Sequence, residues 1–166
     1  MLNEIFLQYE KNIYNLIKLC KGKIIAFDFD GTLTRFQYAD NKMLPCKDED
    51  IETYTKSGGN IYKKIYIFKT MQYIISQLNK EDVFIVTSTV PSLRKIKNKI
   101  IFEKFSIPDE QIIHTAGSLK KIDALIDIHN KKQKDILFLE DNYKILLTAE
   151  ENLSFVRGYL ISSLLA

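Results

Sequence analysis

Short apolar segments alternate with segments of helical periodicity along this chain, and this alternation limits the folds that it can adopt. The apolar segments lie at 24–27, 83–86, 112–113 and 136–139, and another is expected near 155–156. A short apolar run bounded by polar residues is typical of a buried parallel strand. Because strands that alternate with helices are joined by right-handed crossovers, we expect an α/β fold with one parallel sheet and helices on both faces.

Helical spacing of hydrophobic residues predicts the segments between these strands. An amphipathic helix is expected over 2–20, and further helices are expected at 61–78, 93–100, 119–126 and 143–151. Residues 35–60 differ, because they are polar and contain Pro45 and the run Ser57-Gly58-Gly59-Asn60. We interpret 35–60 as a flap plus loop, with which a short hairpin is compatible, inserted into a single domain spanning 1–166.

Composition excludes several classes of protein. The net charge is only +3, which does not by itself indicate a nucleic-acid or membrane partner. Two cysteines do not make a disulfide framework, and no run of about 18 apolar residues predicts a membrane span or a signal peptide. We therefore expect a reduced, cytoplasmic protein. Neither GxGxxG nor GxxxxGK[ST] occurs, so no glycine-rich nucleotide loop is indicated.

Acidic and hydroxyl side chains follow three of the predicted strands. Asp28-Phe29-Asp30-Gly31-Thr32 follows the first strand, Thr87-Ser88 ends the second, and Glu140-Asp141 ends the fourth. Lys120 and Lys121 open the helix that precedes the fourth strand. Ligands of open parallel sheets bind beyond the carboxyl ends of the strands, so we expect these groups to converge on one crevice.

The spacing of the acids points to metal-assisted phosphoryl chemistry. If residue 29 is extended, Asp28 and Asp30 point to the same side of the chain and can bind one hard cation. Glu140 or Asp141 would complete that site. Asp28 can then attack phosphorus to form an aspartyl-phosphate, while Asp30 protonates the leaving oxygen and later activates water. The Thr87 hydroxyl and a lysine would hold the phosphoryl oxygens.

Four segments together resemble the motifs of the haloacid-dehalogenase-like (HAD) hydrolase superfamily. DFDGTLT (28–34) resembles the first motif, and FIVTST (84–89) is similar to the second. Lys121 resembles the third-motif lysine, although the adjacent Lys120 remains an alternative. ILFLEDN (136–142) resembles the fourth motif, in the variant where Glu-Asp replaces the commoner Gly-Asp. The motifs occur in the family's order over residues 24–142.

The resemblance implies a HAD-like, Rossmann-like fold and a Mg²⁺-dependent phosphatase with an Asp28 nucleophile and an Asp30 acid/base. It implies phosphate contacts at Thr87 and Lys121, and we add the hydroxyls of Thr32 and Ser88 at the same strand ends. The implied Mg²⁺ ligands are Asp28, the Asp30 carbonyl and Glu140 with Asp141.

No gap between the motifs is long enough for a full cap domain, so we expect an open site. Such a site admits a phosphorylated macromolecule or is closed by a second subunit in a homodimer. Residues 84–105 loosely resemble a stretch of small 5′-deoxyribonucleotidases, which favours a nucleotide or another phosphorylated metabolite. The rival hypothesis is a non-catalytic phosphate-binding or scaffold relative of the same fold.

Other polar and aromatic features receive simpler interpretations. The basic run Arg94, Lys95, Lys97 and Lys99 can attract an anionic substrate, but a solvated helix face is the favoured interpretation. His114, at a strand end, is interpreted as structural. Tyr62, Tyr66 and Tyr73 are interpreted as half-buried packing residues.

Overall fold

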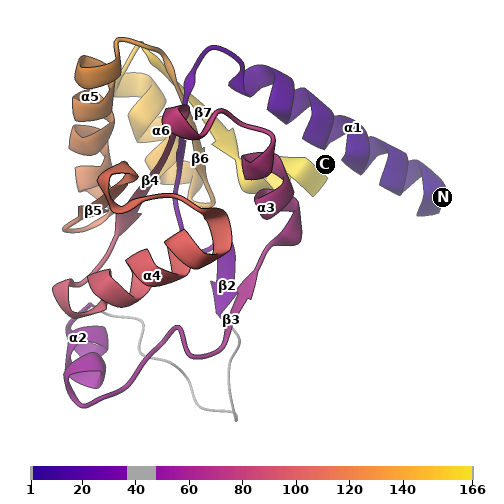
Figure 1. The fold of residues 1–166 in the computed structure, drawn as a ribbon. Helices are drawn as coiled ribbons and strands as arrows, with labels where there is room; N and C mark the ends of the chain where they lie inside the picture. The colour runs from indigo at the N-terminus through magenta and orange to yellow at the C-terminus, as the bar shows by residue number, and fades with distance from the viewer. Residues whose placement is uncertain (1, 37–47, 166) are drawn as a thin grey trace.

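A computed structural model describes residues 2–36 and 48–165. Its centre is a sheet of five parallel strands in the order β5-β4-β1-β6-β7 (Figure 1). The strands are β1 Ile24–Phe27, β4 Val83–Ser88, β5 Ile112–Thr115, β6 Ile136–Glu140 and β7 Val156–Leu160. The apolar runs of the sequence therefore form the strands, and the predicted strand near 155–156 is confirmed.

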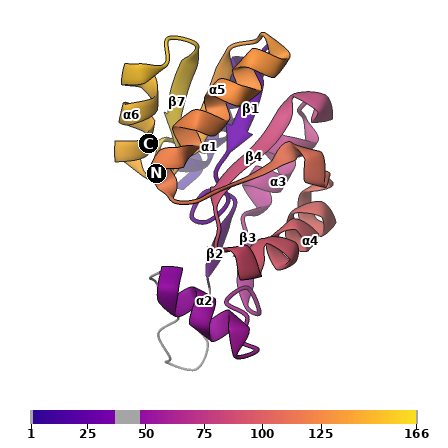
Figure 2. The same ribbon diagram turned by 90° about the vertical axis from the view of Figure 1, so that its left-hand side faces the viewer.

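Helices cover both faces of this sheet, as Figure 2 shows from the side. They are α1 Leu2–Cys20, α3 Lys69–Ser76, α4 Arg94–Phe105, α5 Lys121–Lys132 and α6 Tyr143–Asn152. Alternating side chains of β1 divide the core: Ile25 and Phe27 pack with α1, α3 and α4, whereas Ile24 and Ala26 pack with α5 and α6. This arrangement confirms the expected α/β, Rossmann-like fold with a parallel sheet between two helical layers.

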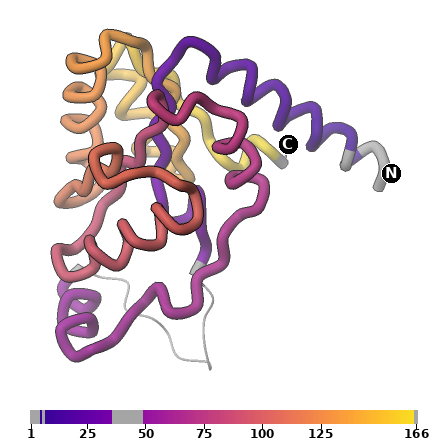
Figure 3. Tube along the Cα trace, in the orientation of Figure 1, coloured from indigo at the N-terminus to yellow at the C-terminus, as the bar shows by residue number. Residues whose placement is uncertain are grey.

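Short turns of 3₁₀-helix connect the larger elements. They are η1 Lys80–Asp82, η2 Pro91–Leu93, η3 Asp109–Gln111, η4 Ser118–Lys120 and η5 Ile161–Leu165. The last of them, η5, packs against α1, where the Asn12 side-chain amide donates to the Leu164 carbonyl at 3.3 Å (Figure 3). No helix within the described ranges has the length and low polarity that crossing a membrane requires.

The region beyond the carboxyl ends of the strands differs from the expectation. A helix, α2 Asp48–Lys56, occupies part of the segment interpreted as flap and loop, and residues 37–47 lie outside the described ranges. Acidic side chains in a first helical turn favour a helix, and Glu52 ties α2 to η2 by accepting from the Ser92 hydroxyl at 2.8 Å.

The helix predicted from Ile61 begins only at Lys69. Before it, β3 Ile65–Ile67 pairs antiparallel with β2 Thr34–Phe36. The exposed Tyr66 lies between the partly buried Ile65 and Ile67 in β3. That alternation has the period of a strand, and pairing with β2 favours it over the helical spacing that the same residues share.

Candidate functional site

The carboxyl ends of three adjacent strands meet at the centre of the sheet. β1 lies between β4 and β6, with Phe27 paired to Ile85 on one side and to Leu139 on the other. Asp28, the residue after β1, donates its backbone N–H to the Leu139 carbonyl at 2.9 Å. Its side chain therefore lies beside the residues that end the two neighbouring strands.

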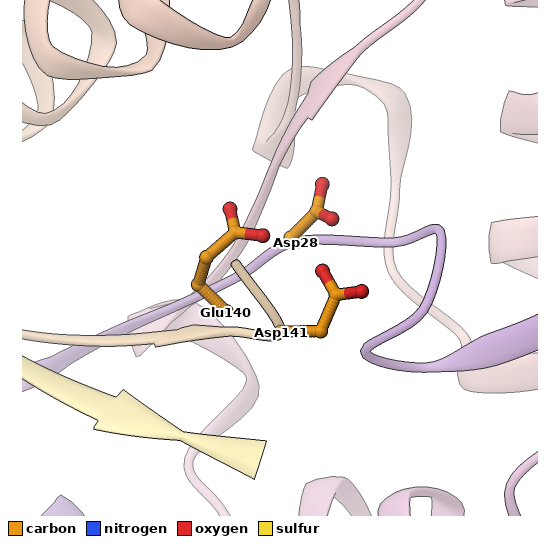
Figure 4. Close-up of side chains that lie close together, drawn as sticks. All are labelled: Asp28, Glu140 and Asp141. Atoms are coloured by element: carbon orange, nitrogen blue, oxygen red, sulfur yellow. The ribbon is translucent and has the colours of Figure 1, made fainter. Parts of the chain in front are cut away.

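Three carboxylates come together at this point. Oxygens of Asp28, Glu140 and Asp141 all lie within 4.8 Å of one another (Figure 4). Asp28 and Glu140 are 5% and 1% exposed, whereas Asp141 faces solvent. The Glu140 carboxylate is held in place, because its Oε1 accepts the Asn142 backbone N–H at 3.2 Å. Such a group of oxygen donors can hold a hard divalent cation.

Lys121 balances part of this negative charge. Its Nζ lies 2.8 Å from Asp28 Oδ1 and 2.7 Å from Glu140 Oε2. Of the two adjacent lysines, only Lys121 reaches the strand ends, since Lys120 pairs with Asp123 on the surface at 3.1 Å. An ammonium group has three N–H donors, so Lys121 keeps one for a ligand.

Burial and mutual repulsion shift the ionisation of these groups. Burial, joined by the charge of Asp30, raises the pKa of Asp28 against the opposing effect of Lys121. Burial and the charge of Asp28 raise the pKa of Glu140 to about 8. Burial lowers the pKa of Lys121, but the charges of Asp28 and Glu140 outweigh it and raise the pKa above its ordinary value. Three carboxylates against one ammonium leave an excess of negative charge that suits a bound cation.

Asp30 lies outside the three-carboxylate group. Its Oδ2 is 2.7 Å from Lys97 Nζ and accepts from the Tyr62 hydroxyl at 3.3 Å. Its Oδ1 is buried and has no hydrogen-bond partner among the described residues. The two aspartates of the DFD segment therefore have separate partners, and only the Asp30 main-chain carbonyl is assigned to the metal by the family resemblance.

The hydroxyl groups of Thr87 and Ser88 lie at the end of β4, and that of Thr32 lies in the turn after β1. Thr87 Oγ1 accepts from Lys97 Nζ at 3.0 Å, which leaves its own O–H free to donate. Ser88 Oγ accepts the Gly117 backbone N–H at 3.2 Å. The Thr32 hydroxyl is buried and finds no partner in the described part of the chain. These hydroxyls can donate to an anionic oxygen, as phosphate binding requires.

Gly31 makes room for the three-carboxylate group. Its φ of +86° lies in the left-handed region, and the Asp141 carboxylate occupies the place where a Cβ atom would project. A residue with a side chain would be strained there and would displace Asp141.

A pocket of about 530 Å³ opens beside Ser88, between α2 and the ends of β4 and β5. Its lining residues are Glu49, Glu52, Ser88, Thr89, Val90, Pro91, Arg94, Thr115, Ala116 and Gly117. Arg94 has no ion-pair partner among the residues that the structure describes, and the Thr89 hydroxyl is buried without a partner there. Arg94 therefore gives the pocket an unpaired charge next to the hydroxyl side of the site.

The interpretation of the basic run was wrong for one residue. Arg94, Lys95 and Lys99 are exposed, as a solvated face requires, but Lys97 is fully buried and contacts Asp30 and Thr87. Tyr62 is only 5% exposed and donates to Asp30, so it does more than pack. The signal for Lys97 was its spacing, because Leu93, Lys97 and Ile101 share one helix face.

The candidate residues found in the sequence all lie at the carboxyl edge of the sheet. The structure brings Asp28, Glu140, Asp141 and Lys121 into one group, and it brings Asp30 and Thr87 together through Lys97. Comparison of the chain with protein-family models and with curated proteins finds no match. The chemistry proposed below therefore depends on these contacts and on the motif resemblance.

Proposed function

We propose that this protein is a Mg²⁺-dependent phosphohydrolase of the HAD-like superfamily that acts through an aspartyl-phosphate on Asp28. The observation that supports this most is the position of Asp28. Its carboxylate lies 2.8 Å from Lys121 Nζ and beside the carboxylates of Glu140 and Asp141, with which it would hold a cation. A nucleophilic carboxylate needs such positive charge on both sides to approach an anionic phosphate.

The three carboxylates fit Mg²⁺ by their donor chemistry. Mg²⁺ binds oxygen ligands and commonly takes carboxylates together with water and substrate phosphate. Asp28, Glu140 and Asp141 would hold it, with the Asp30 carbonyl that the family resemblance adds. When bound, the ion would screen the repulsion between Asp28 and the phosphate and polarise the phosphoryl oxygens.

The side chains around Asp28 supply the remaining roles. An Asp28 oxygen forms a bond to phosphorus as the bond from phosphorus to the leaving oxygen breaks, and Asp30 gives that oxygen a proton. The third N–H of Lys121 and the O–H of Thr87 donate to phosphoryl oxygens, and the hydroxyls of Ser88 and Thr32 are further donors. Asp30 then takes a proton from water, whose oxygen attacks phosphorus and releases Asp28.

The pocket beside Ser88 is the place for the rest of the substrate. It adjoins the phosphate side of the site through Ser88, and Arg94, Glu49 and Glu52 give it charged groups of both signs. A phosphomonoester with a polar leaving group fits this lining, and a nucleotide or another phosphorylated metabolite belongs to that class. A phosphorylated side chain of a macromolecule would reach the same position from outside.

Phosphate release from a broad panel tests this proposal. The panel contains para-nitrophenyl phosphate, nucleoside monophosphates, sugar phosphates and phosphopeptides, each with Mg²⁺ and with EDTA. We expect release only with Mg²⁺, and we expect Asp28→Asn to lose several orders of magnitude in rate because an amide is not a nucleophile. Asp123→Asn, a surface variant of the same chemistry, should match wild type.

Two results would contradict the proposal. Asp28→Asn retaining more than about 10% of wild-type activity would remove the assigned nucleophile. The absence of any Mg²⁺-dependent release across the panel would favour the phosphate-binding scaffold instead, and titration with inorganic phosphate would then measure that binding directly.

A further inference from the structure

We propose that Lys97 is a positioning residue that joins the acid/base Asp30 to the phosphate-binding Thr87. This inference rests on the proposed phosphohydrolase function, in which those two residues act on the same substrate. Lys97 belongs to none of the four motifs, and it comes from α4, a helix that contributes no motif residue.

Three acceptors surround the Lys97 ammonium. Nζ lies 2.7 Å from Asp30 Oδ2, 3.0 Å from Thr87 Oγ1 and 3.2 Å from the Ser88 carbonyl oxygen. These contacts use all three of its N–H donors. Lys97 therefore has no donor left for a substrate, which separates its role from that of Lys121.

Its surroundings make Lys97 an unusual core residue. The side chain is 1% exposed, and Nζ lies 5.4 Å from the centre of the Phe29 ring and 5.6 Å from that of Tyr62. A buried ammonium is costly even when it is paired, and a well-packed apolar side chain at such a position is often at least as stabilising. Packing alone therefore does not account for a lysine here, whereas the need to orient two polar side chains does.

Lys97 fixes the orientation of the Asp30 carboxyl group. Lys97 and Tyr62 both donate to Oδ2, whereas Oδ1 is buried with no protein donor in the described ranges. With Oδ2 held, the carboxyl group cannot rotate without losing both contacts. The Asp30 side chain, which is 29% exposed, is thus held in one orientation.

The same ammonium orients Thr87. Because Lys97 donates to a lone pair of Oγ1, the hydroxyl hydrogen must point elsewhere and can donate to a phosphoryl oxygen. One ammonium therefore aligns a proton donor for the leaving group, from the turn after β1, and a hydrogen-bond donor for the phosphate, from β4.

Leaving-group dependence tests this role. Protonation of the leaving oxygen matters for glycerol 2-phosphate and much less for para-nitrophenyl phosphate, whose phenolate leaves unaided. We expect Lys97→Met to lose at least about tenfold more activity on the alkyl than on the aryl substrate, since general-acid catalysis contributes about 10²–10⁴-fold. Asp30→Asn should show the same imbalance, and the double variant should add little to it.

The exposed Lys95→Met on the same helix is the matched control and should leave both activities unchanged. Lys97→Gln is made in parallel, because an amide satisfies part of the buried polar surroundings if Lys97→Met does not fold. Equal losses on both substrates would show that Lys97 serves stability alone and would overturn the proposal.

A double-mutant cycle on stability tests the contact between Lys97 and Asp30 without an activity measurement. We expect Asp30→Asn and Lys97→Met each to lower the urea midpoint. The double variant should lose much less than the sum of the two single losses, because both substitutions remove the same contact. Additive losses would mean that Lys97 does not hold Asp30.

The two experiments together separate this inference from the proposed function. An inactive wild type with clear coupling between the two substitutions would refute the phosphohydrolase and leave the contact established. An active wild type without coupling, and without unequal losses on the two substrates, would refute only the role of Lys97.

Discussion

At the scale of single residues, two lysines pair with different carboxylates of the candidate site. Lys121 pairs with Asp28 and Glu140, whereas Lys97 pairs with Asp30. Asp28 and Asp30 are only two residues apart, so without separate partners they would share one environment. Different partners give neighbouring carboxylates different roles, which is how active sites assign a nucleophile and an acid/base to the same residue type.

Gly31 permits this arrangement, and its replacement gives the first prediction. We expect Gly31→Ala to lower the free energy of unfolding by more than the roughly 1–2 kcal/mol that the left-handed conformation costs, because the new Cβ also displaces the Asp141 carboxylate. Urea denaturation measures the loss, and phosphate release with Mg²⁺ should fall with it.

Gly22 provides the matched control for Gly31. It has a φ of +74° and nothing within 4 Å of the position of its Cβ. Gly22→Ala should therefore show the conformational cost without loss of activity. If the two variants are equally destabilised and equally active, the contact between Gly31 and Asp141 does not matter.

Lys97 also shows what residue-level sequence analysis missed. A run of basic residues is usually a solvated face, and three of the four here are exposed. The position of Lys97 between Leu93 and Ile101 on one helix face was the contrary signal. Its partners, however, come from the turn after β1 and from β4, and no sequence spacing shows that a buried lysine will find two acceptors in those segments.

At the scale of elements, β5 and α4 meet at His114, which gives the second prediction. His114 Nε2 lies 2.6 Å from Asn98 Oδ1, and the other ring nitrogen is buried without a partner among the described residues. Burial and the charges of Lys97 and Arg94 lower the pKa of His114 from 6.5 to about 4, against the opposing effect of the Asp109 charge. The folded state therefore keeps the ring neutral where the unfolded chain protonates it.

The sign of the pH effect follows from linkage. A lowered folded-state pKa contributes stability that is complete above pH 6.5 and is lost as the pH falls toward about 4. We expect His114→Gln to flatten that part of the stability profile, measured as urea midpoints between pH 7 and about 4. Parallel profiles for wild type and variant would show that other groups cause the acid sensitivity.

The pocket between α2 and the ends of β4 and β5 gives the third prediction. If the leaving group occupies it, Arg94→Ala should raise KM for the best metabolite substrate several-fold. Inhibition by inorganic phosphate should not change, because the phosphate contacts proposed above are Thr87 and Lys121. Lys95→Ala, which removes an exposed charge outside the pocket, is the control. A rise in the inhibition constant for phosphate would place Arg94 at the phosphate instead.

The elements divide into those that sequence pattern predicts and those that depend on tertiary contacts. The five strands of the parallel sheet and the helices α1, α4, α5 and α6 follow from apolar runs and from the spacing of hydrophobic residues within each segment. The helix α2 and the pair β2–β3 do not follow from such patterns. The helix α2 is polar and contacts η2, and β3 needs β2 as its partner. A local sequence pattern does not show that two strands about thirty residues apart will pair.

At the scale of the whole molecule, the sheet order carries the candidate site. Placing β1 between β4 and β6 brings segments that lie more than fifty residues apart to one edge of the sheet. The convergence of the acids was predictable from the rule that parallel strands share a carboxyl edge. The division of the acids between two lysines was not, since it depends on how α4 and α5 pack on opposite faces.

Binding of Mg²⁺ to the folded molecule gives the last prediction. The three-carboxylate group exists only when β1 and β6 are paired, so an ion that binds it stabilises the native state over the unfolded one. Saturation at about one hundred times the dissociation constant would add about 2.7 kcal/mol to the free energy of unfolding. We expect Mg²⁺ to raise the thermal midpoint and EDTA to return it to the metal-free value.

Variants assign this stabilisation to the site. Asp141→Asn removes the exposed ligand of the group without disturbing the buried contacts of Lys121, so it should weaken the Mg²⁺ response while leaving the metal-free midpoint near wild type. Asp123→Asn should respond like wild type, because Asp123 pairs with Lys120 on the surface. A midpoint that does not move with Mg²⁺ in wild type, or that moves equally in Asp141→Asn, would show that these carboxylates do not hold the ion.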